Sequence, residues 1–191
     1  VWYACQQNVH VISMSVGGDP IRWLEGVIAH AIYARNIIVC AAAGNGTPFV
    51  VFPAAYPDCI AVAATTPTDR PSQASSFGPE VTIAAPGHKV WEGDFVNGVP
   101  AVKAGCGTSY ATPHVAGAAA LWLHAHGRDA LLQRYRGSAS LQEVFKLLLR
   151  QTARNPGVLP APGADGEVRR EQEYTWNTGL YGAGILDVGA R

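Results

Sequence analysis

The chain has 191 residues, of which 48% are hydrophobic and 15% charged, and its 14 basic and 14 acidic residues leave no net charge. This composition indicates one compact globular domain and excludes a disordered chain. The charge balance also argues against a surface that binds nucleic acid or an acidic membrane. Its longest apolar runs are interrupted before about 18 residues, so no membrane span is expected.

The first half of the chain predicts a parallel sheet. Four apolar segments are short, rich in small or β-branched residues and continuous, which is typical of strands buried on both faces. They cover residues 9–15, 37–43, 60–65 and 81–85. Between the first two, residues 20–36 carry apolar side chains at helical spacing, with Asp19 as the expected N-cap and Pro20 in the first turn. This order predicts a right-handed βαβ unit.

The second half predicts two helices and a loop. Helices are expected over residues 112–126 and 141–152, with Ser140 as a possible cap of the second. Residues 155–179 are rich in proline, glycine and charge, which favours a surface loop or insertion. Together these elements predict an α/β fold with a mostly parallel sheet.

The four cysteines match no zinc-binding pattern, because no CxxC pair occurs. Cys40 lies in the apolar segment "IIVCAAA" and is expected to be a buried thiol. Cys5, Cys40, Cys59 and Cys106 allow three complete disulfide pairings, among which the spacing does not choose.

Three segments bring polar residues to the ends of predicted strands, where parallel sheets form their sites. They read "SVGG" (15–18), "AGNG" (43–46) and "GCGTS" (105–109). Ser109 follows a glycine turn and precedes a helix, so free backbone N–H groups and a positive helix end would favour an oxyanion beside a hydroxyl nucleophile. The Asn45 amide could donate to that oxyanion. Taken singly, Ser109 can also be read as an N-cap and Asn45 as a turn residue.

These segments carry a family resemblance. "ISMSVGG", "VCAAAGNG" and "GTSYATPHVAGAAAL" resemble the substrate-wall, oxyanion-hole and nucleophile motifs of the subtilisin-like serine proteases, the subtilase or peptidase S8 family. "FPAAYPDCIAVAAT", "ASSFGPEVTIAAPG" and the closing "YGAGILDVGAR" extend the likeness over nearly the whole chain. The resemblance implies a three-layer αβα fold, with residues 1–191 forming a single partial domain, the C-terminal two-thirds of a catalytic domain.

The resemblance also implies a role for each matching residue. Ser109 would be the nucleophile, and Asn45 would bind the oxyanion together with the Ser109 backbone N–H. An extended polypeptide substrate would add as a strand to one wall of the groove. Phe52–Pro53 matches a position where the family often has a cis proline. The residues expected to bind substrate are Ser15, Val16 and Gly17 on one wall, Ala43 and Gly44 on the opposite wall, and Thr108.

The nucleophile needs a base, which the resemblance places upstream of this chain. In the family, Asp and His precede the serine, so both are expected on the N-terminal part of the domain. His114 is expected to be structural, and His126 would lie about 25 Å along the helix from Ser109. A circular permutation that uses Asp187 is a minor alternative. We therefore expect a serine endopeptidase in the parent protein and a catalytically incomplete chain here.

Other readings remain open. The chief alternative is a catalytically inactive protease-like module that binds extended peptides or a partner protein. Another α/β hydrolase is disfavoured because no GxSxG elbow occurs. The expected partner is the N-terminal part of the same domain or a second copy, since exposed strand edges invite pairing. No cofactor is required, although the loops that carry Asp58 and Asp69 could hold calcium. The resemblance further implies secretion.

Overall fold

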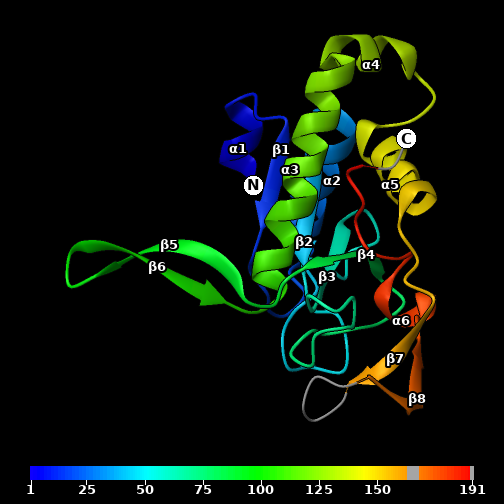
Figure 1. Ribbon diagram of the computed structural model, residues 1–191. Helices are drawn as coiled ribbons and strands as arrows, with labels where there is room; N and C mark the ends of the chain where they lie inside the picture. The colour runs from blue at the N-terminus through cyan, green and yellow to red at the C-terminus, as the bar shows by residue number, and fades with distance from the viewer. Residues whose placement is uncertain (163–167, 190–191) are drawn as a thin grey trace.

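The computed structural model describes residues 1–162 and 168–189. A parallel four-stranded sheet with the strand order β1-β2-β3-β4 runs through its centre (Figure 1). All four predicted strands form, in chain order. They are β1 (Val11–Met14), β2 (Ile38–Ala42), β3 (Ile60–Thr65) and β4 (Val81–Pro86).

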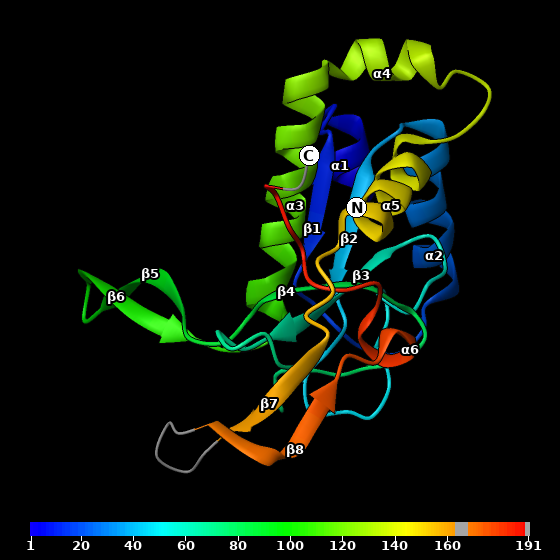
Figure 2. The same cartoon turned by 45° about the vertical axis from the view of Figure 1, so that its right-hand side comes forward.

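Helices cover both faces of this sheet (Figure 2). One face packs against α2 (Arg22–Ala29) and its continuation η1 (His30–Ala34), and the other against α3 (Thr108–His126) and α5 (Leu141–Thr152). Alternate residues of β2 serve the two layers, because successive strand side chains point to opposite faces. Val39 and Ala41 join the core on the α2 side, whereas Ile38 and Cys40 join the core under α3 and α5. The fold is thus the expected three-layer αβα arrangement.

The first residues of two helices show where the local sequence was sufficient to predict the N-cap and where it was not. The predicted cap of α5 is confirmed: Glu143 N–H donates to Ser140 Oγ at 3.2 Å, and Ser140 N–H donates to Glu143 Oε2 at 2.7 Å. The predicted start of the helix over 20–36 is wrong. Helix α2 begins at Arg22, and Ile21 occupies the N-cap position without a side-chain cap. A tertiary contact replaces the expected Asp19 cap, since the Ile21 N–H donates to the Tyr56 hydroxyl at 2.8 Å.

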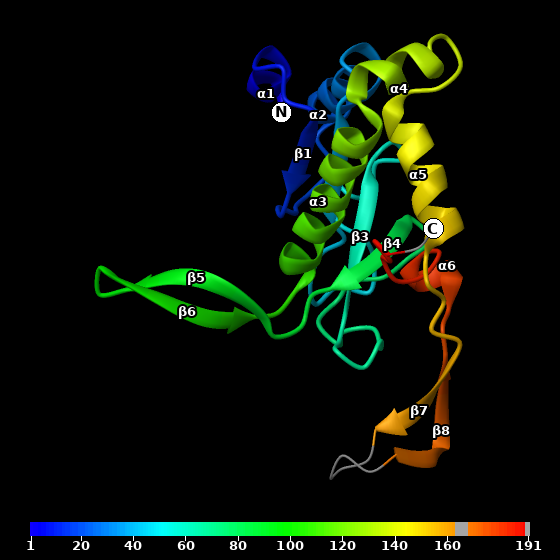
Figure 3. The same ribbon diagram turned by 45° about the horizontal axis from the view of Figure 1, so that its top comes forward.

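Two antiparallel hairpins stand apart from the central sheet (Figure 3). The first joins β5 (Val90–Val96) to β6 (Val99–Gly105), so the segment that ends in "GCGTS" does not continue the parallel sheet. The second joins β7 (Val158–Pro162) to β8 (Val168–Thr175), within the region predicted as a surface loop or insertion. Of that region, residues 163–167 lie outside the described residues. Three short helices complete the fold: α1 (Trp2–Gln6), α4 (Arg128–Arg134) and α6 (Thr178–Tyr181).

The two edges of the sheet differ. The closing segment covers the β4 edge, where Ala84 N–H donates to Gly184 O at 2.9 Å and Leu186 N–H donates to Ala84 O at 2.8 Å. Strand β1 has no further strand beside it among the described residues, and its Ser13 is exposed. No helix within 1–162 or 168–189 is long and apolar enough to cross a membrane.

All four cysteines are free thiols, so none of the three possible disulfide pairings is formed. Cys5, Cys40 and Cys59 are buried, and Cys106 is exposed. Burial raises the pKa of Cys40 far above its usual range and that of Cys59 to about 12. These two thiols therefore stay protonated, as expected for Cys40.

Candidate active site

The three glycine-containing segments meet at the start of α3. The Thr108 N–H donates to Asn45 Oδ1 at 3.0 Å, and the Thr108 hydroxyl accepts a hydrogen bond from Gly44 N at 3.2 Å. From the other side, the Ser15 hydroxyl donates to the Ser109 carbonyl at 3.0 Å. Thr108 is fully buried, so it joins two segments and holds its neighbour Ser109 between the ends of β1 and β2.

The backbone at Gly107 explains why a helix starts here. Gly107 is the N-cap residue, with φ of 137°, a value that glycine adopts readily and other residues avoid. Its N–H donates to Gly87 O at 2.7 Å, which anchors the turn to the end of β4. Helix α3 begins at Thr108, four residues before the predicted start, and Ser109 lies half-buried in its first turn.

Two N–H donors beside Ser109 are free. Asn45 Oδ1 must be the oxygen that faces Thr108, because a backbone N–H points at it, and this leaves Asn45 Nδ2 without an acceptor among the described residues. No described residue accepts from the Ser109 N–H either. Both donors lie at the N-terminal end of a 19-residue helix, where the macrodipole favours negative charge. The structure therefore brings together the groups from which an oxyanion site can be built.

A cavity of about 440 Å³ opens beside Ser109. Ser15, Val16 and Gly17 form one side of it, and Gly44 and Asn45 contribute to the other. Ala43 does not line this cavity: it is fully buried, and its neighbour Ala42 faces the cavity instead. Successive side chains at the end of β2 point to opposite faces of the sheet, so Ala42 faces the cavity and Ala43 does not.

Sequence reasoning missed six residues that line the same cavity: Gly18, Asp19, Ala42, Thr47, Phe49 and Val51. Val51 belongs to the segment before the cis Phe52–Pro53 bond, which was the geometry expected there. A Cβ added to Gly17 would lie 2.6 Å from Val51 Cγ2, so glycine is needed where this wall approaches Val51. The available signal was the "GG" pair, which predicts that another segment packs closely against the backbone here but does not identify that segment.

All six histidines lie within the described residues, and none of them forms a hydrogen bond with Ser109. No described residue forms a hydrogen bond with Ser109 Oγ. His114 shares a cavity with Ser109, and its Nδ1 lies 2.8 Å from the Tyr110 carbonyl on the same helix. His126 lies at the opposite end of α3. His114 thus has the structural contact that was expected of it.

The carboxylates considered for calcium have protein partners. The Tyr33 hydroxyl donates to Asp58 at 2.6 Å, and Arg154 binds both oxygens of Asp69 at 2.7 and 2.8 Å. This ion pair lowers the pKa of Asp69. Over the described part of the chain, no group of three or more His, Cys, Asp or Glu side chains could hold a metal ion. Calcium bound largely by carbonyl groups stays a prediction.

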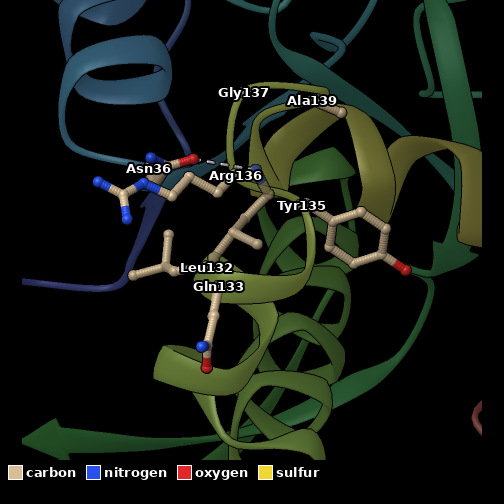
Figure 4. A pocket seen from close by; sticks show the side chains of 8 residues that line it. Asn36, Leu132, Gln133, Tyr135, Arg136, Gly137 and Ala139 are labelled. Atoms are coloured by element: carbon tan, nitrogen blue, oxygen red, sulfur yellow. Dashed lines mark hydrogen bonds between the residues drawn. The ribbon is translucent and has the colours of Figure 1, made fainter.

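Another cavity, of about 490 Å³, lies near α4, away from Ser109 (Figure 4). Asn36 joins its two sides, because its Oδ1 accepts from the Leu141 N–H at 3.2 Å. Its lining contains Arg136 and Tyr135 but no serine, cysteine, histidine or carboxylate. This cavity therefore offers no nucleophile and no base from those side chains.

Comparison with known proteins gives a consistent result. The family model described as the subtilase family matches residues 1–183. Subtilisin NAT of Bacillus subtilis subsp. natto is 37% identical over 143 residues, covering 68% of this chain and 36% of its own length. The major intracellular serine protease of Bacillus subtilis (strain 168) is 33% identical over 158 residues, covering 78% of this chain and 46% of its own length.

A solved structure extends the match to three dimensions. The prenylagaramide maturation protease PagA superposes with a TM-score of 0.70 and 27% identity, covering 97% of this chain and 62% of its own. The chain thus spans between about a third and a half of the two curated relatives that it matches. The order of the three segments, the geometry at Ser109 and these matches agree, and the chain belongs to the subtilase family of serine proteases.

Proposed function

We propose that this chain carries the nucleophile and the oxyanion-binding groups of a serine endopeptidase. The observation that carries the proposal is the junction at the start of α3. There, Ser109 lies beside a cavity with two unused N–H donors, its own and that of Asn45 Nδ2. Donors fixed by the fold and directed at a developing oxyanion contribute strongly to acyl transfer.

The reaction follows from these groups. Ser109 Oγ attacks the carbonyl carbon of a peptide bond, and the negative charge that develops on the carbonyl oxygen is bound by the two N–H donors. The C–N bond then breaks, and the proton from Oγ leaves with the amine. Water adds to the acyl ester, which releases a carboxylate and restores the serine hydroxyl. A base must carry the proton in both steps. We infer that this base is a histidine held by an aspartate on the N-terminal part of the catalytic domain.

Polypeptide substrate would bind along the Ser15–Gly17 segment. The backbones of Val16 and Gly17 make no hydrogen bond to another described residue, and the Val16 side chain is 62% exposed. An extended peptide could therefore pair with this segment and place a side chain in the 440 Å³ cavity. The cavity walls are mostly small, which suits a bulky apolar side chain, and Asp19 adds one carboxylate to its lining.

A second function has one observation in its favour. Because no described histidine forms a hydrogen bond with Ser109, we propose as the alternative that this chain is a module that binds extended peptides without cleaving them. The two functions differ in turnover rather than in binding. Secretion is a further proposal.

Hydrolysis of an unstructured protein such as casein by the full product of the gene tests the proposal. We expect proteolysis that the Ser109→Ala variant loses and that Ser138→Ala, which changes an exposed serine in the loop after α4, retains. We expect residues 1–191 alone to be inactive under the same conditions. Peptide binding without turnover by the full product would favour the binding module instead.

A further inference from the structure

The β5–β6 hairpin carries its polar groups on one face. Residues directly opposite in an antiparallel pair share a face, and Glu92 is opposite Lys103. Lys103 Nζ lies 3.5 Å from Glu92 Oε1 and 3.1 Å from Asp94 Oδ2. The other face is apolar, with Trp91, Phe95 and Val102 each more than two-thirds exposed. The polar face therefore holds two carboxylates and one ammonium group.

Tyr110 links this polar face to the helix that carries the nucleophile. It follows Ser109 in α3, and its ring lies against Gly105, where any Cβ would overlap it. Its hydroxyl donates to Glu92 Oε1 at 2.9 Å. Lys103 contacts the same oxygen, so Glu92 Oε2 has no partner among the described residues. One oxygen of a carboxylate that is bound by the neighbour of the nucleophile therefore remains free to accept.

Ser109 separates two cavities. The second has a volume of about 640 Å³ and is lined by Trp91, Glu92, Cys106 and Tyr110, among other residues. Ser109 is the one residue that lines both this cavity and the 440 Å³ cavity. A polypeptide whose peptide bond reacts at Ser109 must extend to both sides of this residue. If the Ser15–Gly17 side receives the acyl part, the hairpin side receives the amine part.

We propose that the β5–β6 hairpin binds the part of a polypeptide substrate that follows the scissile bond, and that Glu92 favours a basic side chain there. The inference rests on the proposed function. Glu92 is the only acidic residue in the lining of the 640 Å³ cavity, and a guanidinium or ammonium group could reach its open Oε2. Hydrogen bonds between charged partners are the stronger ones, so the contact discriminates between substrates. Lys103 opposes this contact, because its ammonium group repels a basic side chain of the substrate.

The experiment uses the full product of the gene and quenched fluorescent peptides that differ only in the two positions after the cleaved bond, Arg-Arg against Glu-Glu. We expect kcat/KM to favour the basic peptide, with the preference falling about tenfold in Glu92→Gln, as the loss of one charge-assisted contact implies. Lys103→Met should raise the preference. Glu25→Gln, on an exposed part of α2, is the matched control and should leave it unchanged. Active enzyme with the same preference in wild type and Glu92→Gln would overturn the inference.

A binding measurement covers the case in which no peptide is cleaved, which would contradict the proposed function but not this inference. In the Ser109→Ala variant, fluorescence anisotropy should show tighter binding of the basic peptide than of the acidic one. The additional substitution Glu92→Gln should remove most of that difference. Equal affinities for the two peptides would contradict a role of Glu92 in substrate choice.

Discussion

At the residue scale, the Asn45 side chain presents two groups to the start of α3, one bonded and one free. Its Oδ1 fixes the start of α3 through the Thr108 N–H, and that bond leaves Nδ2 as a free donor beside Ser109. We expect Asn45→Ala to slow acylation of Ser109 by about 10- to 100-fold, the cost of one hydrogen bond to a charged group. The labelling rate with a fluorophosphonate measures this. An unchanged rate in a folded variant would exclude Asn45 from the oxyanion site.

The thiols give a second test at the same scale. Cys106 is exposed, whereas Cys5, Cys40 and Cys59 are each less than 5% exposed. We expect one thiol per native chain to react quickly with Ellman's reagent, none to react quickly in Cys106→Ser, and four to react after unfolding without reductant. Fewer than four under denaturing conditions would reveal a disulfide and contradict the structure.

Sequence predicted Ser109 and Asn45 as site residues because their motifs occur together and in the order of a known family, whereas each taken singly has an ordinary reading as a cap or a turn residue. It misplaced Ala43 and overlooked Val51, because both depend on which face of a strand or loop points inward. A one-residue shift moves a side chain to the opposite face. The cap proposed at Asp19 failed for a related reason, since the Tyr56 hydroxyl, 35 residues further along the chain, occupies the Ile21 N–H.

At the element scale, helix α5 is joined to the sheet by one buried polar side chain. Gln142 is only 1% exposed; its Oε1 accepts from the Val39 N–H at 2.9 Å, and its Nε2 donates to the carbonyls of Val39 and Asp58. Gln142→Ala removes these three buried hydrogen bonds and should lower the free energy of unfolding by about 2–4 kcal/mol. Urea unfolding of this variant measures the loss.

The matched control for Gln142→Ala is Leu147→Ala on the same helix. The Leu147 side chain is 55% exposed, so its removal should cost less than about 1 kcal/mol. Similar losses in the two variants would show that burial of the α5 face, and not the Gln142 contacts, holds the helix in place.

The elements themselves were predictable to different degrees. Strands β2, β3 and β4 are buried on both faces, which is why continuous apolar runs identified them. The β5–β6 hairpin was missed because most of its residues are exposed and leave no apolar run. Its turn at Asn97–Gly98, with positive φ at both residues, was a usable signal. Helix α3 starts early because Asn45 from another segment satisfies the Thr108 N–H.

At the scale of the whole molecule, the β1 edge and the first helices expose apolar surface. Tyr3 is 72% exposed and Trp23 is 68% exposed, and no described strand covers β1. We expect residues 1–191 alone to elute in size-exclusion chromatography as a dimer or larger species, because open edges and apolar surface favour association. A clean monomer at micromolar concentration would contradict this expectation.

The most direct test of the account is the reaction of the full gene product with a fluorophosphonate, followed by mass spectrometry of its peptides. We predict one adduct, on Ser109, that forms at least 100-fold faster than in residues 1–191 alone, since general-base catalysis contributes about that much. An adduct on another residue, or Ser109 labelled equally fast in the two proteins, would contradict the claim that Ser109 is a nucleophile activated by a base outside this chain.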